Sequence, residues 1–369
     1  MHLILEASQS ANRSGTGRYT VQLLKALAQL PDTGLSLSAL WPEGATLPEG
    51  CGAVDCVTLP TAPLSRLIRT GRGVAGLTSP PPDLVHYPAN FGSFMGREPF
   101  VVTVHDLSFM RHPEWFRWSR ALYYRNAARR SVHRARRVIV DSEATATDVK
   151  KFLGIDAKKI DVIPLGLDAS WHQAEEDSIT RVRQQYALPE QYFLYAGTLE
   201  PRKNVPRILS AWDRIAGETS WDLVLAGRVG WKAEAIEKAL AQVRYPERVH
   251  RPGFVDDGDL PAVMSGAATF VWPSLFEGFG LPPLEAMACG TPVISSNSSS
   301  IPEVTGDAAL LVDPESVDAL AEAMRALSDS PALAKELSEK GLARVRPFTW
   351  TRTARMTLET YRRVLGQST

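Results

Sequence analysis

The feature that most limits the fold of this chain is an alternation of short apolar runs with amphipathic stretches. In residues 1–170, the runs HLILEA, FVVTVHD, RVIVDS and DVIPLGLD are separated by helical stretches such as TVQLLKALAQL, ATATDVKKFLG and the region around Ala121–Arg137. Runs rich in Val, Ile and Leu are typical of parallel strands buried on both faces, and helical connections between them make βαβ units. The pattern predicts a doubly wound parallel sheet.

A second series of the same kind follows the polar stretch 172–178. It contains the runs YFLYAG, WDLVLAG, VHRPGF, ATFVWPS and TPVISS, with helical stretches at Val205–Ile215 and AEAIEKALAQV. Since 369 residues have room for two domains, we expect a linker between Gly166 and Asp177. The predicted division is one domain over residues 1–170, one over 171–345, and an amphipathic helix in 346–369 with Thr349 or Thr351 as its cap.

The charge composition excludes one class of partner. The 41 Lys and Arg residues balance 41 Asp and Glu residues, and 44% of the chain is hydrophobic, as in an ordinary globular protein. Residues up to Leu165 carry 20 basic and 14 acidic side chains (+6), and the rest carry 21 and 27 (−6). Because no net charge and no zinc-finger or RNA-binding motif is present, we expect no nucleic-acid partner.

Cysteine usage and the amino terminus indicate the compartment. Cys51, Cys56 and Cys289 cannot all pair, and no His lies at metal-ligand spacing beside the first two, so the sequence predicts reduced thiols. The first ten residues lack a basic leader, and no run of about 18 apolar residues occurs in the chain. These features predict a cytoplasmic protein without a membrane span.

The densest group of chemically informative residues is LFEGFGLPPLEAMACGTP at residues 275–292, after the run ATFVWPS. Gly278 and Gly280 allow close approach to backbone N–H groups, and the prolines that follow can begin a helix whose positive end faces the same place. Glu277 in the loop and Glu285 in the helix could each accept hydrogen bonds from hydroxyls. We interpret the segment as a cradle for an anion and a polyol. Taken singly, either glutamate also fits a plain strand-to-helix turn.

Two further strand ends carry groups suited to phosphate. Arg202 and Lys203 follow the run YFLYAG, where two cations can neutralise a diphosphate leaving group, although a solvated basic turn is the alternative. Gly15 and Gly17 belong to Ser14–Tyr19, between the first strand and the first helix, where glycines let phosphate approach a helix N-terminus. The segment lacks the third glycine of a dinucleotide fingerprint, so an ordinary βα turn is also open.

Histidines end two of the predicted strands. His105 and Asp106 end FVVTVHD, and a strand-end histidine can hydrogen-bond a sugar or move a proton. We take His105 as a candidate catalytic residue, with a structural histidine as the alternative, and Asp106 as a group that orients it or caps the next turn. His86, in DLVHYPAN, is a candidate on the acceptor side.

Two other patterns have competing interpretations. Asp257 and Asp259 spell the D-x-D pattern that can hold Mg²⁺ or Mn²⁺ with a diphosphate, but Asp259 is better placed as a helix cap, so no metal is expected. Residues 107–137 contain nine arginines and one acidic residue, Glu114, interleaved with aromatic side chains. Such a helix can lie on an anionic membrane surface, or pack on the core with a solvated arginine face.

Together these segments resemble the retaining glycosyltransferases of family 4, which have the GT-B fold. The stretch Glu277–Glu285 is similar to the paired-glutamate motif of that family, and the resemblance extends over essentially the whole chain through THD, VIPLGLD, YAGTLEPRKN, LVLAGRVGW, PGFVDDGDL and SIPEV. It implies an α/β architecture of two Rossmann-like doubly wound domains facing a central cleft. The acceptor side would be residues 1–170 and the donor side 171–345, with the helix in 346–369 returning to the N-terminal domain.

The resemblance also implies roles for individual residues. Glu277 would hold hydroxyls of the transferred sugar, His105 would contact another hydroxyl, and Glu285 would hold the ribose of the donor. Arg202 and Lys203 would bind the diphosphate. The remaining donor-binding positions surround the sugar, the diphosphate and the base, at Gly15, Gly17, Phe254, Gly278, Phe279, Gly280 and Leu281.

We therefore expect an enzyme that moves a hexose from a nucleotide diphosphate sugar to a hydroxyl of a glycan or lipid-linked glycan, with retained configuration. The overall resemblance to bacterial O-antigen mannosyltransferases indicates GDP-mannose as the donor. No carboxylate of the motif is placed as a covalent nucleophile, and neither a cofactor nor a metal is expected. The expected location is cytoplasmic, peripheral at the inner face of the cytoplasmic membrane.

Three other functions stay open at this point. A glycosidase would use Glu277 and Glu285 as acid and as nucleophile or base. A dinucleotide-dependent oxidoreductase would use the first βα turn with Asp32, although Asp32 follows a helix and not a second strand. A sensor would bind the sugar nucleotide without turnover.

Overall fold

The computed structural model describes residues 1–10, 15–31, 33–52, 54–59, 74, 78, 80–93, 96–230 and 234–367. The chain forms two compact units. One combines Met1–Gly166 with Phe348–Thr369, and the other is Leu167–Pro347. Ser14 of the predicted phosphate turn and Asp32 of the oxidoreductase alternative lie outside the described residues.

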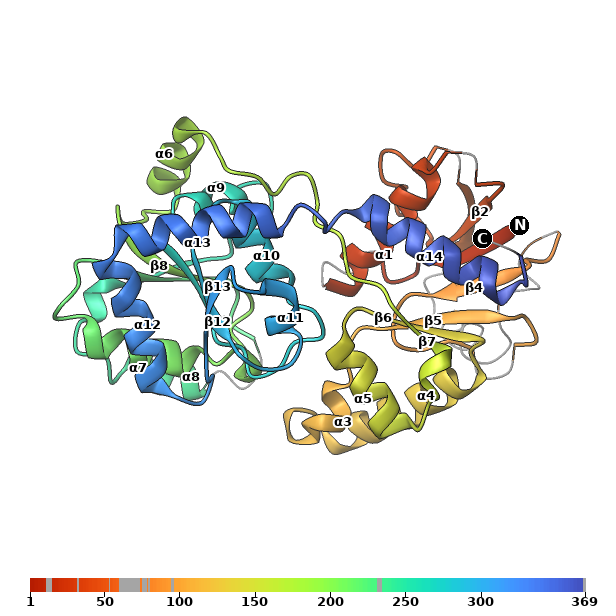
Figure 1. The fold of residues 1–369 in the computed structure, drawn as a ribbon, viewed down its shortest axis with the longest axis horizontal. Coiled ribbons are helices and arrows are strands. Elements are labelled where there is room, and N and C mark those ends of the chain that lie inside the picture. Colours follow the sequence, from red (N-terminus) through yellow and green to blue (C-terminus); the bar gives the residue numbers. More distant parts are fainter. Residues whose placement is uncertain are drawn as a thin grey trace. The chain divides into compact units, whose positions relative to one another are not determined.

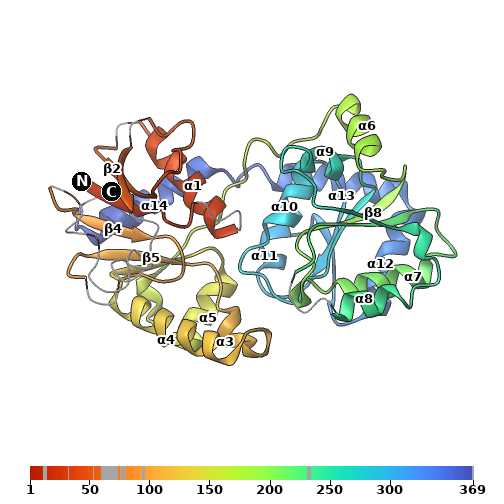
Figure 2. The ribbon, with the colours of Figure 1, turned by 180° about the vertical axis from the view of Figure 1, so that it is seen from behind.

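The first unit is built on a seven-stranded parallel sheet in the order β3-β2-β1-β4-β5-β6-β7. Its strands are β1 (His2–Glu6), β2 (Ser36–Pro42), β3 (Asp55–Leu59), β4 (Leu84–Tyr87), β5 (Phe100–Val104), β6 (Arg137–Val140) and β7 (Ile160–Val162). Its helices are α1 (Gly15–Gln29), α3 (Ser108–Arg111), η3 (Pro113–Trp115), α4 (Trp118–Arg134), α5 (Glu143–Leu153), η4 (Ala157–Lys159) and α14 (Trp350–Val364). Figures 1 and 2 show α1 and α14 on one face of the sheet, with α4 and α5 on the other. This is a doubly wound sheet.

The second unit is built on a six-stranded parallel sheet in the order β10-β9-β8-β11-β12-β13. Its strands are β8 (Tyr192–Ala196), β9 (Asp222–Ala226), β10 (Val249–Gly253), β11 (Thr269–Trp272), β12 (Val293–Ser296) and β13 (Ala309–Val312). Its helices are α6 (Glu176–Gln185), η5 (Pro201–Lys203), α7 (Val205–Ile215), α8 (Glu234–Leu240), η6 (Pro246–Arg248), α9 (Leu260–Ser265), α10 (Leu281–Ala288), α11 (Ile301–Thr305), α12 (Val317–Asp329) and α13 (Pro331–Arg344). In Figure 1, α7 and α12 cover one face of this sheet, and α9, α10 and α13 cover the other.

The predicted fold class, two Rossmann-like doubly wound parallel sheets, is confirmed. The helix predicted around residues 121–137 is displaced, because α4 ends at Arg134, Ala135 leaves the helix at ψ 144°, and Arg137 already begins β6. Strand β2 and the edge strands β3 and β13 were not predicted. Thr349 caps α14 as predicted, since its hydroxyl accepts a hydrogen bond from the Arg352 N–H at 3.2 Å.

A buried chain of polar groups ties α14 to the first sheet. The hydroxyl of Tyr361 lies 2.7 Å from His86 Nδ1, and His86 Nε2 lies 2.8 Å from the Thr103 hydroxyl, which also contacts the Tyr19 hydroxyl at 3.0 Å. At Gly166, a Cβ atom would sit 2.3 Å from the backbone nitrogen of Trp350, so only glycine lets the two segments approach this closely. The chain thus returns to its first unit through specific contacts and not through apolar packing alone.

Candidate active site

The loop between β11 and α10 is held in shape by hydroxyl groups. Ser300 Oγ donates to the carbonyl oxygens of Glu277 at 3.0 Å and Phe279 at 2.6 Å, and the Ser299 hydroxyl also donates to the Glu277 carbonyl. Gly280 precedes α10 with φ +114°, and a Cβ there would sit 2.7 Å from Ile301 Cδ1. The second glycine of the motif is therefore required by its backbone conformation.

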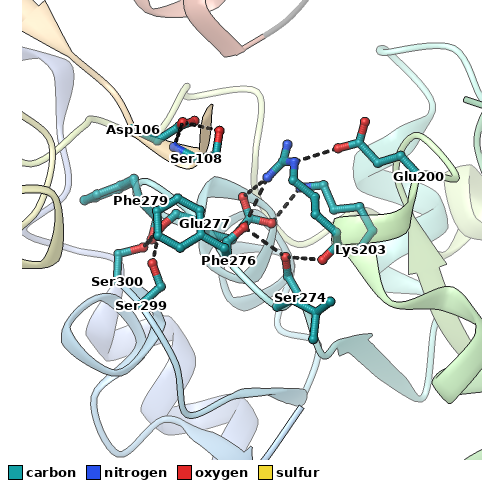
Figure 3. A network of polar contacts seen from close by, with 12 residues as sticks. Asp106, Ser108, Glu200, Lys203, Ser274, Phe276, Glu277, Phe279, Ser299 and Ser300 are labelled. Atoms are coloured by element: carbon teal, nitrogen blue, oxygen red, sulfur yellow. Dashed lines mark hydrogen bonds and ion pairs between the residues drawn. The ribbon is translucent and has the colours of Figure 1, made fainter. Parts of the chain in front are cut away.

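The carboxylate of Glu277 is the centre of a buried ion-pair cluster (Figure 3). Its Oε1 lies 2.6 Å from Lys203 Nζ and accepts from Trp272 Nε1 at 3.2 Å, and its Oε2 lies 2.8 Å from Arg202 Nη1. The exposed fraction of Glu277 is 7% and that of Lys203 is 8%. The Lys203 ammonium also lies 4.3 Å from the centroid of the Trp272 ring, so its charge is met by both a carboxylate and an aromatic face.

The loops that follow β8 and β11 are joined by main-chain contacts. The Arg202 carbonyl accepts hydrogen bonds from the Leu275 N–H at 2.9 Å and the Ser274 hydroxyl at 3.1 Å. Arg202 Nε also pairs with Glu200 Oε1 at 2.7 Å. Two cations and two carboxylates are thus gathered where two neighbouring parallel strands end, which is where ligands bind in open α/β sheets.

The two central charges perturb one another. Burial alone would raise the pKa of Glu277, but the charges of Lys203 and Arg202 outweigh it and bring the pKa to about 2. Burial and the neighbouring Arg202 charge lower the pKa of Lys203 to about 8, even though Glu277 opposes this. Both groups are therefore ionised at neutral pH, and Glu277 carries no proton that it could donate as a general acid.

The other residues predicted in this segment lie in or beside α10. Leu281 begins the helix and Phe279 is buried just before it, while Glu285 lies in the second turn with an exposed fraction of 5%. Gly278 lies in the loop between Glu277 and Phe279. Their predicted contacts with a donor stay predictions.

His105 belongs to the first unit, and both of its ring nitrogens face acceptors. Nδ1 lies 2.6 Å from Asp141 Oδ2, and Nε2 lies 2.8 Å from the carbonyl oxygen of Pro88. A carboxylate and a carbonyl only accept, so both nitrogens carry protons. Burial lowers the pKa of His105, but Asp141 more than offsets this and the pKa is raised. In this state the ring is a hydrogen-bond donor and has no lone pair with which to take a proton.

Three further predicted groups of the first unit are Asp106, His86 and the glycines of the first βα turn. Asp106 accepts hydrogen bonds from the N–H and the hydroxyl of Ser108, at 2.8 and 2.6 Å, and so caps the turn that begins α3. His86 is fully buried on Tyr361 and Thr103, which fits a structural histidine and not an acceptor-side group. Gly15 and Gly17 lie in the first turn of α1, because the helix begins at Gly15 and leaves neither glycine in a connecting loop.

Phe254 and the D-x-D pattern follow β10, which is an edge strand of the second sheet. Phe254 is 40% exposed, and the guanidinium of Arg228 lies over its ring at 4.3 Å. Asp259 occupies the N-cap position of α9 but makes no capping hydrogen bond, because Arg181, Gln185 and Tyr186 hold its carboxylate at 2.7, 3.0 and 2.7 Å. The prediction that Asp259 stands at the N-cap position is right, and the prediction that its side chain caps the helix is wrong.

Two features are absent from the residues that the structure describes. No helix in that part of the chain combines the length and apolar character needed to cross a membrane. Over the same residues, no group of three or more His, Cys, Asp or Glu side chains is arranged to hold a metal ion.

Comparison with known proteins identifies the family. Residues 178–344 match the model for glycosyl transferases group 1, and residues 13–171 match the model for glycosyltransferase family 4. The O-antigen chain mannosyltransferase B of Escherichia coli is 33% identical over 284 residues, which are 76% of this chain and 74% of that protein. The chain belongs to glycosyltransferase family 4. Of the functions considered from the sequence, the glycosyltransferase is therefore the one that holds.

Solved structures share the fold of the glycosyltransferase. Sucrose-phosphate synthase from Thermosynechococcus elongatus matches with a TM-score of 0.77 and 23% identity over 100% of both chains. HepE from Anabaena, in complex with UDP and glucose, matches with a TM-score of 0.74 and 21% identity over 98% of both. At such identities the likeness establishes the GT-B fold, as predicted.

The sequence interpretation did not select four side chains that the structure places at these sites, one of them, Arg228, because a charge at its place is typical of a helix end. Glu200 and Trp272 contact the cations of the Glu277 cluster, Asp141 holds His105, and Arg228 covers Phe254. Each of them follows or ends a predicted strand, so position alone could have selected them. Nothing in their local sequence distinguishes them from the many other residues at strand ends.

Proposed function

We propose that the glycosyltransferase moves a mannosyl residue from GDP-mannose to a hydroxyl of a glycan or lipid-linked glycan, with retained anomeric configuration. The name of its E. coli relative, O-antigen chain mannosyltransferase B, supports the choice of sugar and acceptor class. HepE, solved with UDP and glucose, supports a nucleotide and a sugar as ligands. The single observation that carries the proposal is the cluster of Glu277, Lys203 and Arg202 where β8 and β11 end.

In the proposed reaction, the bond between the anomeric carbon and the diphosphate breaks and a bond to the acceptor oxygen forms. The proton of the acceptor hydroxyl leaves with the departing diphosphate, so atoms and charge balance. Arg202 and Lys203 stabilise the charge that develops on the diphosphate. Glu277 holds these two cations in place and accepts a hydrogen bond from a hydroxyl of the sugar. With a pKa of about 2, Glu277 is deprotonated at neutral pH and has no proton to donate, which argues against Glu277 as the acid of a glycosidase.

We also propose that turnover needs no metal. The carboxylate of Asp259, the D-x-D residue closest to a helix, is already bonded by a guanidinium, an amide and a phenol, which leaves little of its lone-pair capacity for a cation. Turnover in excess EDTA should equal turnover in added Mg²⁺, and abolition by EDTA would contradict this.

We further propose that the protein associates peripherally with the inner face of the cytoplasmic membrane, through the outer face of α4. Trp118, Leu122 and Tyr123 are exposed to 79%, 51% and 48%. The helix has no acidic residue, and its later turns carry Arg125, Arg129 and Arg130 on the exposed side. Exposed rings beside cationic side chains favour the interface of an anionic bilayer.

The test of the catalytic proposal is transfer from radiolabelled GDP-mannose to a lipid-linked glycan extract, with the anomeric configuration of the product read by NMR. Arg202→Ala should lose both donor binding and turnover, because it removes a charge-assisted contact worth roughly 1.5–3 kcal/mol. Transfer from UDP-glucose but not from GDP-mannose would overturn the donor assignment. An inverted product would overturn the retaining mechanism.

A further inference from the structure

Asp141 is a buried carboxylate to which the proposed reaction gives no role. It directly follows β6, its exposed fraction is 2%, and its Oδ2 lies 2.6 Å from Nδ1 of His105. Its other oxygen, Oδ1, is buried and makes no hydrogen bond within the residues that the structure describes. Because a buried charge is costly unless it is paired, the histidine ring is the group that makes this carboxylate tolerable.

The pairing of the strands brings the two side chains together. Val104, the last residue of β5, is in register with Val140, the last residue of β6, so His105 and Asp141 each stand one residue beyond neighbouring strands. Such strands are about 5 Å apart. Pro88, whose carbonyl oxygen lies 2.8 Å from His105 Nε2, follows β4 on the other side of β5. The ring is therefore held between acceptors at the ends of the two flanking strands.

The backbone of His105 and the surroundings of its ring are fixed as well. Its N–H donates to Asn90 Oδ1 at 2.8 Å, and its carbonyl oxygen accepts from the Thr145 hydroxyl at 3.2 Å. The Tyr19 ring meets the imidazole edge to face, with the centroids 4.7 Å apart, and the Tyr19 hydroxyl contacts the Thr103 hydroxyl at 3.0 Å. A flip of the imidazole would break both of its ring hydrogen bonds, so the two acceptors decide how the ring is protonated.

The titratable groups that face the ring come from several elements. They are Asp141 after β6, Asp106 next along the chain, Tyr19 on α1 and His86 on β4. Burial lowers the pKa of His105, but Asp141, with a smaller contribution from Asp106, more than offsets this and raises the pKa. Burial lowers the pKa of His86 to about 3 and raises that of Tyr19, so both of these neighbours are uncharged at neutral pH.

We propose that Asp141 is a positioning residue that holds His105 as an imidazolium, so that the end of β5 brings a fixed positive charge to the transfer reaction in place of a base. A fixed cation favours a transition state in which negative charge builds up on the leaving diphosphate. A neutral histidine would instead take the proton of the acceptor hydroxyl. The first role needs the ring protonated and the second needs it deprotonated, so the two have opposite pH dependences. This inference rests on the proposed function, because it assigns Asp141 a part in that transfer.

The charge of the ring can be measured without any assay of turnover. In proton–nitrogen NMR spectra of protein that carries isotope-labelled histidine, an imidazolium has two protonated nitrogens and a neutral ring has one. The His105 signals are identified by their loss in His105→Gln. At neutral pH the parent should show His105 as an imidazolium and His86 as a neutral ring. Asp141→Asn keeps an acceptor beside Nδ1 but removes the charge, so it should shift the titration of His105 to lower pH.

The pH profile of mannosyl transfer tests the part that this charge has in turnover. In the parent, kcat should fall as the pH rises through the titration of His105. Asp141→Asn should move this fall to lower pH, with a several-fold loss of kcat at neutral pH that is partly regained in acid. Glu114→Gln is the matched control, because it removes a carboxylate 3.1 Å from an exposed histidine of the same unit, His112. It should leave the profile unchanged.

Three results would overturn the role of Asp141. A neutral His105 ring in the parent at neutral pH would remove the cation, and a kcat that rises with the titration of His105 would make this histidine a base. Both results come from the parent, so they stand even if Asp141→Asn does not fold. An unchanged titration of His105 in Asp141→Asn would mean that another group sets its charge. If the parent transfers no sugar while its His105 is an imidazolium, the proposed function fails and the pairing with Asp141 holds.

Discussion

At the scale of single residues, the pKa shifts of Glu277 and Lys203 act in opposite directions on the stability of the fold. The lowered pKa of Glu277 stabilises the folded state at neutral pH, and the lowered pKa of Lys203 opposes this, while the attraction between the two groups enters both shifts. Taking two charges out of water costs free energy that their mutual attraction need not repay. We therefore infer that these buried charges are kept for the chemistry of the site.

The ion pair of Glu277 and Lys203 should be detectable in the pH dependence of the free energy of unfolding. Glu277→Gln leaves Lys203 buried beside Arg202 without its carboxylate and should lower the free energy of unfolding by about 3–5 kcal/mol at pH 6. A carboxyl group whose pKa is lower in the folded state stabilises the fold at pH values above its unfolded pKa. This stabilisation is lost as the pH falls toward the folded pKa. The difference between parent and variant should shrink by about 2 kcal/mol between pH 6 and pH 3, measured by urea unfolding. A constant difference would contradict the ion pair.

Substitution of Glu277 and of Glu285 should have different effects on turnover and on GDP binding. Glu277→Gln should depress turnover, while GDP still binds as well as in the parent or better, because Arg202 and Lys203 lose a competing carboxylate. Glu285→Gln should weaken GDP about tenfold if Glu285 holds the ribose. Calorimetry of both variants with GDP decides between them, and equal weakening in both would reject this division of roles.

At the scale of one element, the two faces of α4 have different surroundings. Ala121, Ala128 and Val132 pack on the core, while Trp118 and Leu122 face outward. Arg134, at the end of the helix, donates to the carbonyl oxygens of Ser93 and Gly96 and so belongs to the fold. The arginines available to a membrane are those of the middle turns.

Binding to anionic vesicles should therefore depend on the middle turns of α4. The triple variant Arg125→Gln, Arg129→Gln and Arg130→Gln should weaken sedimentation with phosphatidylglycerol vesicles by roughly a hundredfold at low salt, at about 1 kcal/mol for each cation. Added salt should weaken binding of the parent in the same direction. Lys150→Gln, Lys151→Gln and Lys158→Gln remove the same charge from α5 and η4 and serve as the control. Equal loss in both triples would mean that only net charge matters.

At the scale of the whole molecule, the first unit is discontinuous in sequence. Its last helix, α14, comes from residues beyond the second unit and buries Trp350, Leu358 and Tyr361. Each large apolar side chain contributes roughly 1.5–3 kcal/mol when it is buried, so the first unit depends on a segment that is synthesised after the second unit.

Deletion of residues 348–369 should therefore destabilise one unit selectively. Amide exchange should accelerate in peptides from residues 1–166, whose helix α1 loses its α14 neighbour, and stay as in the parent in peptides from 167–347. Tyr361→Phe is a milder companion, because it removes only the hydroxyl that contacts buried His86, at a cost of about 1–3 kcal/mol. Uniform acceleration in both units would contradict the division.

The sequence by itself determined the two parallel sheets and the edge at which the site lies. Strands buried on both faces must be apolar along their length. YFLYAG and ATFVWPS can therefore be recognised as strands from the sequence, without knowledge of the strands that pair with them. Parallel strands bring all their carboxyl ends to one edge, so Arg202, Lys203 and Glu277 could be assigned to one region. Strands β2 and β3 were missed because Ser, Asp and Thr interrupt their apolar residues. Strand β13 is a short apolar run, ALLV, that was not recognised as a strand.

Only the tertiary structure decided which of these groups touch. Glu277 meets Lys203 across 74 residues, and His86 meets Tyr361 across 275, so neither pair has a local sequence signature. Arg228 followed a strand like many other charged residues, and its place over Phe254 appeared only once the loops after β9 and β10 were in register. Periodicity in a sequence encodes burial, whereas contact between side chains depends on strand order and loop conformation, which are set by the packing of the whole unit.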